Sequence, residues 1–138
     1  MNLKVPAVRL IQLPLIAEAR GSLSFGQYDT QLPFIPIRYF IVFDVPRAEV
    51  RGNHAHRRVT QALVCVKGSL TVTLDDGQNR DGVTLDSPAR GLLIPPLVWA
   101  TQEDFSPDGV LLVLSSEPYD AAEYIRDYGE FLHLVNRK

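Results

Sequence analysis

Short runs of apolar residues alternate with turn-forming residues along nearly the whole chain. The run Ile37–Phe43 is rich in aromatic and β-branched residues, which favour a pleated sheet. Similar runs predict further strands at 8–11, 23–26, 61–66, 70–74, 83–85, 91–94, 98–102 and 110–115. The ten prolines fall mainly between these runs, where they do not interrupt strand pairing. The pattern therefore predicts an all-β protein, an antiparallel sandwich or barrel.

Turn signals and one helical pattern refine this picture. Lys67-Gly68-Ser69 separates two predicted strands and predicts a hairpin, and Asp75-Asp76-Gly77 predicts a second tight turn. A helix is predicted only at Asp120–Tyr128, which follows Pro118 and carries acidic residues early. At 138 residues, the chain is predicted to form one domain, 1–138.

Composition excludes several classes of function. The net charge of -2 gives no electrostatic reason to expect binding to nucleic acid or to an anionic membrane. No segment is long and apolar enough to predict a membrane span, and residues 1–15 lack the unbroken apolar core of a signal peptide. Cys65 is the only cysteine, lies in an apolar run and is predicted to be a small core residue. We therefore expect a cytoplasmic protein.

His54 and His56 form the most informative pair in the chain. One residue separates them, so in an extended strand both side chains leave the same face, with Ala55 turned away. Two imidazoles that share one space indicate either metal binding or proton transfer near neutral pH.

The residues that follow weigh against a metal. Metal-binding cupin barrels place a glutamate after the His-x-His pair and a glycine six residues later. Here Gln61 and Gly68 occupy that register, so the carboxylate is missing, and Pro95–Thr101 lacks the histidine of the second cupin motif. Two neutral ligands make a weak divalent site. We therefore expect no metal, and proton transfer by the histidines instead.

Other candidate residues each have two interpretations. Arg51 is either a phosphate clamp or a solvated arginine at the end of a strand. Tyr39 could donate its hydroxyl to a sugar oxygen or be a half-buried strand tyrosine, and Arg38 would face the opposite way. Trp99 could form the wall of a pocket or belong to the core.

Several further motifs occur in order along the chain. They are Arg51-Gly52-x-His54-Ala55-His56, Leu74-Asp75-Asp76-Gly77, Leu85-Asp86-Ser87-Pro88, Val98-Trp99, Asp104-Phe105-Ser106 and Tyr124-Ile125-Arg126-Asp127-Tyr128, together with Pro33-Phe34-x-x-x-Arg38-Tyr39. Through them the chain, from about Arg20 to Phe131, resembles the nucleotide-sugar 3,4-ketoisomerases of the WxcM-like and FdtA-like group, which act on dTDP-4-keto-6-deoxyglucose.

The resemblance implies a fold and a reaction. The fold would be a cupin jelly-roll barrel whose subunit forms a homodimer, often by exchange of N-terminal strands. The reaction would use no metal and no cofactor. A base removes the C3 proton of the dTDP-linked 4-keto-6-deoxyhexose, an enediol or enediolate forms, and a proton is delivered to C4. The 3-keto product would feed 3-amino-sugar synthesis.

The resemblance also implies roles for individual residues. His54 would be the base, His56 would relay protons or hold the hexose, and Tyr39 would act near C4. Arg51 and Arg38 would bind the pyrophosphate, and the cavity would also contain Gln61 and Trp99. Many relatives carry a large polar residue where this chain has Ala100. We expect Ala100 to alter which face of C4 receives the proton.

Two alternatives remain open. The first is a nucleotide-sugar epimerase of the rhamnose-pathway cupin type, which pairs its base with an aspartate that is not evident beside His54. The second is a non-catalytic cupin that binds a metal or a small ligand.

Overall fold

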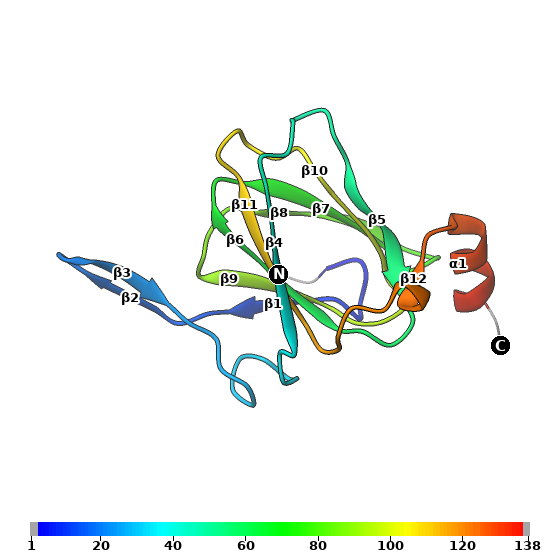
Figure 1. Ribbon diagram of the computed structural model, residues 1–138, viewed down its shortest axis with the longest axis horizontal. Helices are drawn as coiled ribbons and strands as arrows, with labels where there is room; N and C mark the ends of the chain where they lie inside the picture. Colours follow the sequence, from blue (N-terminus) through cyan, green and yellow to red (C-terminus); the bar gives the residue numbers. More distant parts are fainter. Residues whose placement is uncertain (1–2, 137–138) are drawn as a thin grey trace.

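Two five-stranded antiparallel sheets face each other across a hydrophobic core in the computed structural model (Figure 1). The structure describes residues 3–136, so residues 1, 2, 137 and 138 of the predicted domain lie outside the described residues. In spatial order the first sheet contains β1 (Arg9–Gln12), β9 (Arg90–Ile94), β6 (Gln61–Lys67), β11 (Val110–Ser115) and β4 (Arg38–Phe43). The second contains β12 (Tyr124–Ile125), β5 (Arg51–His56), β10 (Trp99–Glu103), β7 (Leu70–Asp75) and β8 (Arg80–Leu85).

Alternating side chains explain how each sheet buries one face. In β7, Leu70, Val72 and Leu74 are buried, whereas Thr71 and Thr73 between them are partly exposed. The inward residues meet those of the first sheet, such as Leu63, in one core. Each fully buried leucine side chain stabilises the fold by roughly 2 kcal/mol. The predicted all-β class, with a short C-terminal helix, is confirmed.

The predicted hairpin around Gly68 is wrong. The chain does turn at Gly68, whose φ is +70°, but β6 and β7 lie in different sheets and do not pair with each other. Each strand carries an apolar face, and the two faces approach the same core from opposite sides. The second predicted turn is confirmed, because β7 pairs with β8 and Gly77 at the turn has a φ of +94°.

The predicted helix at Asp120–Tyr128 is also wrong. The segment forms a short 3₁₀ turn, η1 (Ala121–Glu123), and then β12, which pairs with β5 and buries Ile125. The helix α1 (Tyr128–Val135) begins later, because the Asp127 carboxylate accepts a hydrogen bond from the Glu130 backbone N–H at 2.9 Å and caps the first turn. Helix propensity near Asp120 is outweighed by strand pairing.

A separate two-stranded hairpin, β2 (Leu15–Glu18) with β3 (Gly21–Ser24), extends away from the two sheets (Figure 1). The sequence pattern placed a strand at 23–26, two residues late, and did not predict β2. Leu15, Ile16 and Leu23 on this hairpin are exposed. Within residues 3–136, no helix has the length and apolar character needed to cross a membrane.

Candidate active site

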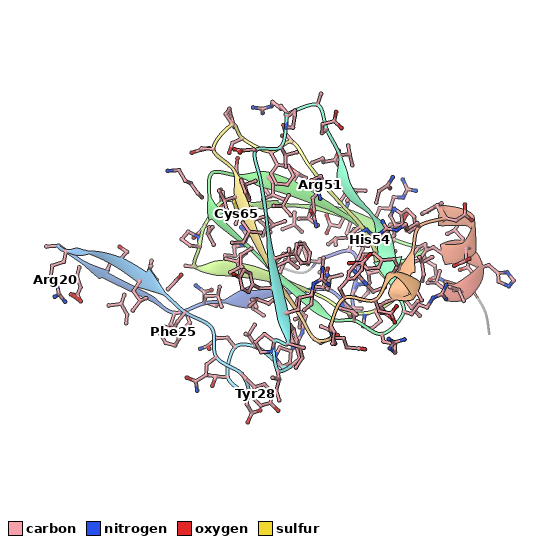
Figure 2. All side chains as sticks on the ribbon, in the orientation of Figure 1. Arg20, Phe25, Tyr28, Arg51, His54 and Cys65 are labelled. Atoms are coloured by element: carbon pink, nitrogen blue, oxygen red, sulfur yellow. The ribbon has the colours of Figure 1, made fainter. Side chains whose placement is uncertain are left out.

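The histidine pair lies on β5 and faces the space between the sheets. His54 and His56 point inward, and Ala55 packs on the other side against Trp99 and Phe131, as the spacing predicted. The two imidazole rings meet edge to face, with centroids 5.0 Å apart and planes at 89°. Figure 2 shows His54 near the end of β5 that approaches β12, with Arg51 further back along the same strand.

Tyr124 is a third ring at this point, and the sequence analysis gave it no role. It lies on β12 opposite His56 in the strand ladder. Its ring centroid is 4.8 Å from that of His54 and 4.6 Å from that of His56. The only signal in the sequence was its place in the Tyr-Ile-Arg-Asp-Tyr motif, which had been interpreted as helix.

A cavity of about 320 Å³ opens beside His54. Three arginines (Arg38, Arg51 and Arg126) reach it, and two amides (Gln61 and Gln102) lie among its polar groups. Permanently charged, forked guanidinium groups suit phosphate oxygens, and the amides can bond to hydroxyl groups. The remaining lining comes from Phe40, Val42, Gly52, His54 and Tyr124. The predicted residues Arg38, Arg51 and Gln61 therefore meet in one cavity with His54.

Burial keeps both imidazoles neutral at pH 7. Burial, followed by repulsion from His54, lowers the pKa of His56 from 6.5 to about 4, although the Glu123 carboxylate acts in the opposite direction. Burial also lowers the pKa of His54, against a smaller opposing effect of a hydrogen bond to the Gly52 backbone. Among the described residues, Nδ1 and Nε2 of His56 have no hydrogen-bond partner. His54, which lines the cavity, can therefore accept a proton from a ligand, whereas the ring nitrogens of His56 are buried behind it.

Four predicted site residues do not line this cavity: Tyr39, His56, Trp99 and Ala100. Tyr39 lies on the outer face of β4 and is 66% exposed, whereas Arg38 and Phe40 on either side of it line the cavity. Strand alternation turns the Tyr39 hydroxyl away from this cavity, and its role near C4 stays a prediction. Trp99 does line a cavity, but a different one, of about 320 Å³ on the outer face of the second sheet. It faces outward from β10 and packs beneath α1, with its ring centroid 5.2 Å from that of Tyr128 and 5.5 Å from that of Phe131.

Ala100 does lie beside the histidines. It is the partner of His54 in the β5–β10 ladder and packs against the residues of the inner core.

Glu123 is a buried carboxylate behind the pair. Its Oε1 accepts hydrogen bonds from the backbone N–H groups of Arg58, at 2.5 Å, and Val59, at 2.8 Å. Its Oε2 lies 3.2 Å from the Arg58 guanidinium. Glu123 thereby ties the segment that follows His56 to the segment that carries Tyr124. Sequence reasoning missed it, because a lone glutamate in a predicted helix gives no sign of burial.

The described side chains around the histidine pair do not form a set of metal ligands. In the part of the chain from 3 to 136, no three His, Cys, Asp or Glu side chains are grouped so that they could hold a metal ion. The expectation of a metal-free reaction stays a prediction.

The amino-acid sequence matches a known protein family and a related enzyme. The WxcM-like, C-terminal (FdtA) family model matches residues 6–136. The chain is 44% identical over 123 residues to the TDP-4-oxo-6-deoxy-α-D-glucose-3,4-oxoisomerase of Aneurinibacillus thermoaerophilus, covering 89% of this chain and 88% of that protein.

Solved structures agree with the sequence match. The 3,4-ketoisomerase QdtA from Thermoanaerobacterium thermosaccharolyticum, in a histidine-to-asparagine variant bound to TDP-4-keto-6-deoxyglucose, superposes with a TM-score of 0.92, 34% identity and 94% coverage of both chains. The TDP-quinovose 3,4-ketoisomerase of Campylobacter jejuni superposes with a TM-score of 0.88 and 38% sequence identity. The match covers 91% of this chain and 97% of that one. Sharing its sequence pattern, its jelly-roll sheets and its length with these isomerases, the chain belongs to the WxcM-like (FdtA) family of sugar 3,4-ketoisomerases.

Proposed function

We propose that this protein converts dTDP-4-keto-6-deoxyglucose into a dTDP-3-keto-6-deoxyhexose. The observation that carries the proposal is the neutral His54 imidazole, in a cavity with three arginines and in ring contact with neutral His56. A neutral imidazole is the form that can remove a proton, and arginines suit the pyrophosphate of a nucleotide sugar. The relatives named above are 3,4-ketoisomerases of TDP-linked sugars.

The reaction moves hydrogen between adjacent carbons. His54 removes the proton from C3, which the neighbouring C4 ketone makes acidic, and the C–H electron pair forms a C3–C4 double bond. The C4 oxygen takes the negative charge, and the C3 hydroxyl proton can pass to it. The protonated imidazole then returns a proton to C4, while the electron pair on the C3 oxygen forms the C3 ketone and the proton on the C4 oxygen stays there as the new hydroxyl. Hydrogen-bond donors near the enediolate oxygens can lower the barrier by several kcal/mol.

The chemistry of several other residues at the site suits them to further roles. Arg51 and Arg38 would bind the pyrophosphate, and Gln61 would hydrogen-bond to a sugar hydroxyl. His56 would share the proton with His54 across their edge-to-face contact. Tyr124 would hold both rings in place, because its ring contacts each of them.

A deuterium experiment tests the proposal directly. Purified protein is incubated with dTDP-4-keto-6-deoxyglucose in D₂O, and C3 and C4 are followed by NMR. We expect deuterium at C4 of a 3-keto product, and we expect His54→Asn to reduce the rate at least about 100-fold. Exchange without migration of the ketone would indicate an epimerase, and neither exchange nor migration of the ketone would indicate a binding protein. Either result would overturn the proposal.

The active form is further proposed to be a homodimer that exchanges the β2–β3 hairpin. A two-stranded hairpin is marginally stable alone. This one exposes Ile16 and Leu23 as a cross-strand pair, and the outer face of β4 exposes Tyr39, Ile41 and Phe43. Insertion of the hairpin into a second copy would cover apolar surface on both molecules.

Light scattering on a sizing column tests the exchange. The double variant Ile16→Asp/Leu23→Asp should be monomeric, because it places two charges on the apolar face of the hairpin. The matched variant Ala17→Asp/Ser22→Asp changes the opposite face and should remain dimeric. A wild-type monomer, or two variants that behave alike, would contradict the exchange.

The proposal treats 1–138 as one catalytic domain, which the family match over 6–136 supports. Its substrate, a charged nucleotide sugar, does not cross a lipid bilayer unaided, and this favours the predicted cytoplasmic location.

A further inference from the structure

Arg51 and His54 face the same cavity although they are three residues apart on one strand. In a regular strand, residues separated by an odd number point to opposite faces. The ladder with β10 explains the exception. His54 is paired with Ala100 and Arg51 with Gln102, so three steps along β5 match two steps along β10. The register shift is a β-bulge at Gly52–Asn53.

The backbone at the bulge is left-handed at two successive residues. Gly52 has a φ of +77° and Asn53 a φ of +60°. Glycine adopts this conformation freely, and asparagine tolerates it better than most other residues. A Cβ atom on Gly52 would lie 3.1 Å from the carbonyl oxygen of Ala100, so the strands also approach closely here. The residue types at 52 and 53 therefore favour the bulge.

A hydrogen bond on the outer face holds Asn53. The Trp99 indole Nε1–H donates to Asn53 Oδ1 at 3.2 Å. The indole is only 7% exposed and is fixed by ring contacts with Tyr128 and Phe131 of α1. A continuous set of contacts thus runs from α1, through Trp99, to the backbone between Arg51 and His54.

We propose that Asn53 and Trp99 are positioning residues whose hydrogen bond maintains the bulge. The bulge is what allows the Arg51 guanidinium and the His54 imidazole to meet one substrate. If the strand became regular, one of the two would turn to the outer face. The inference rests on the proposed function for the identity of the substrate, although the geometry that it explains does not.

Graded substitutions of Asn53 separate the contribution of its hydrogen bond to Trp99 from that of its tolerance of a positive φ. Asn53→Asp keeps an acceptor and a residue that tolerates positive φ, Asn53→Gly keeps only the backbone freedom, and Asn53→Ala keeps neither. We expect kcat/KM of Asn53→Asp to stay within about threefold of wild type. It should be about tenfold lower in Asn53→Gly and about 100-fold lower in Asn53→Ala. Trp99→Phe keeps the packing, removes the donor and should match Asn53→Gly.

A double variant and a control sharpen the test. Asn53→Gly with Trp99→Phe should lose no more activity than either single change, because both remove the same hydrogen bond. Thr73→Val is the matched control. It removes a hydrogen bond of 2.7 Å to Glu103 from the same outer face, a bond in which neither Asn53 nor Trp99 takes part. It should lower Tm without changing kcat/KM or the Kd for dTDP, whereas the bulge variants should weaken dTDP binding as well.

The outcomes are distinct. Folded Asn53→Gly and Trp99→Phe proteins with wild-type kcat/KM and dTDP affinity would overturn the inference, even if Asn53→Ala did not fold. Wild-type protein that fails to isomerise the sugar would overturn the proposed function instead. In that case NMR of the His54 imidazole still decides the inference without substrate. An altered His54 pKa in Asn53→Gly and Trp99→Phe, but not in Thr73→Val, would support it, and unchanged titration would overturn it.

Discussion

The imidazole of His54 meets that of His56 edge to face, with ring centroids 5.0 Å apart, and the Tyr124 ring contacts both. Protonation of either histidine places a positive charge next to the other in a poorly solvated space. Burial and this mutual repulsion lower the pKa of His56 to about 4, and burial lowers that of His54 as well. The pair is thus prepared as a base over a wider pH range than free imidazole.

The pH dependence of kcat/KM should show this directly. We expect the acid limb of the profile to have an apparent pKa below 6.5, because both histidines lose their protons more readily than free imidazole. The limb belongs to the coupled pair rather than to one ring. Rates measured from pH 4.5 to 8, with circular dichroism to confirm folding at each pH, test this. Half-maximal activity above pH 6.5 would contradict it.

Stability should also fall on acidification. The unfolded chain binds a proton at His56 near pH 6.5, whereas the folded protein does so only near pH 4, so the unfolded state holds more protons between these values. The free energy of unfolding therefore decreases as the pH falls from 6.5 to 4, by at most about 3 kcal/mol from this residue. Urea unfolding of wild type and His56→Asn at pH 7 and 5 isolates this contribution. Equal pH dependence in the two proteins would exclude it.

Tyr124 and Tyr39 should differ sharply in importance. Tyr124→Ala removes the ring against both histidines and should lower kcat/KM by at least about tenfold. Tyr39→Phe removes a hydroxyl from a side chain that is 66% exposed outside the cavity and should leave kcat/KM within about twofold. Steady-state kinetics on both variants decide the matter. A large loss in Tyr39→Phe would support the role that the sequence suggested for it.

Glu123 should act on both stability and the histidines. Glu123→Ala leaves two buried backbone N–H groups without their acceptor and should destabilise the fold by about 1–3 kcal/mol. It should also lower the pKa of His56 further, because the carboxylate raises it. Glu117→Ala is the control, since Glu117 also pairs with Arg58, at 3.2 Å, but is partly exposed. We expect that variant to lose at most about 1 kcal/mol. Urea unfolding and NMR titration of His56 measure the two effects, and equal losses in both variants would contradict the role of Glu123.

Local patterns predicted much of this molecule, because alternation is a local property. The strands and the common face of His54 and His56 follow from a period of two residues. The pattern could not tell which face of β4 meets the cavity, and so Tyr39 was preferred as a catalytic group over its neighbours. Nor could it place β6 and β7 in different sheets, because sheet membership depends on partners far away in the chain.

The remaining errors have specific physical causes. Asp120 and Asp127 both cap short helical turns, and only strand pairing of Tyr124 decides that the α-helix starts at the second. The shared face of Arg51 and His54 depends on a bulge, which breaks the alternation that sequence reasoning assumes. Trp99 lines an outer cavity and also packs beneath α1, and its apolar signal in the sequence does not show which face of the sheet it is on.

Ala100 provides the test of product stereochemistry. It is the ladder partner of His54, so a longer side chain at this position would extend beside the His54 side chain. Ala100→His would place a third imidazole there as a further proton donor, and we expect it to change the ratio of gluco- to galacto-configured 3-keto products. NMR of the product mixture before and after the substitution measures that ratio.

Ala100→Val, which fills space without a titratable group, is the control. If both variants gave the wild-type ratio, the face of protonation at C4 would be set by groups other than residue 100. If valine and histidine changed the ratio equally, the effect would be steric rather than proton donation, because only histidine can deliver a proton.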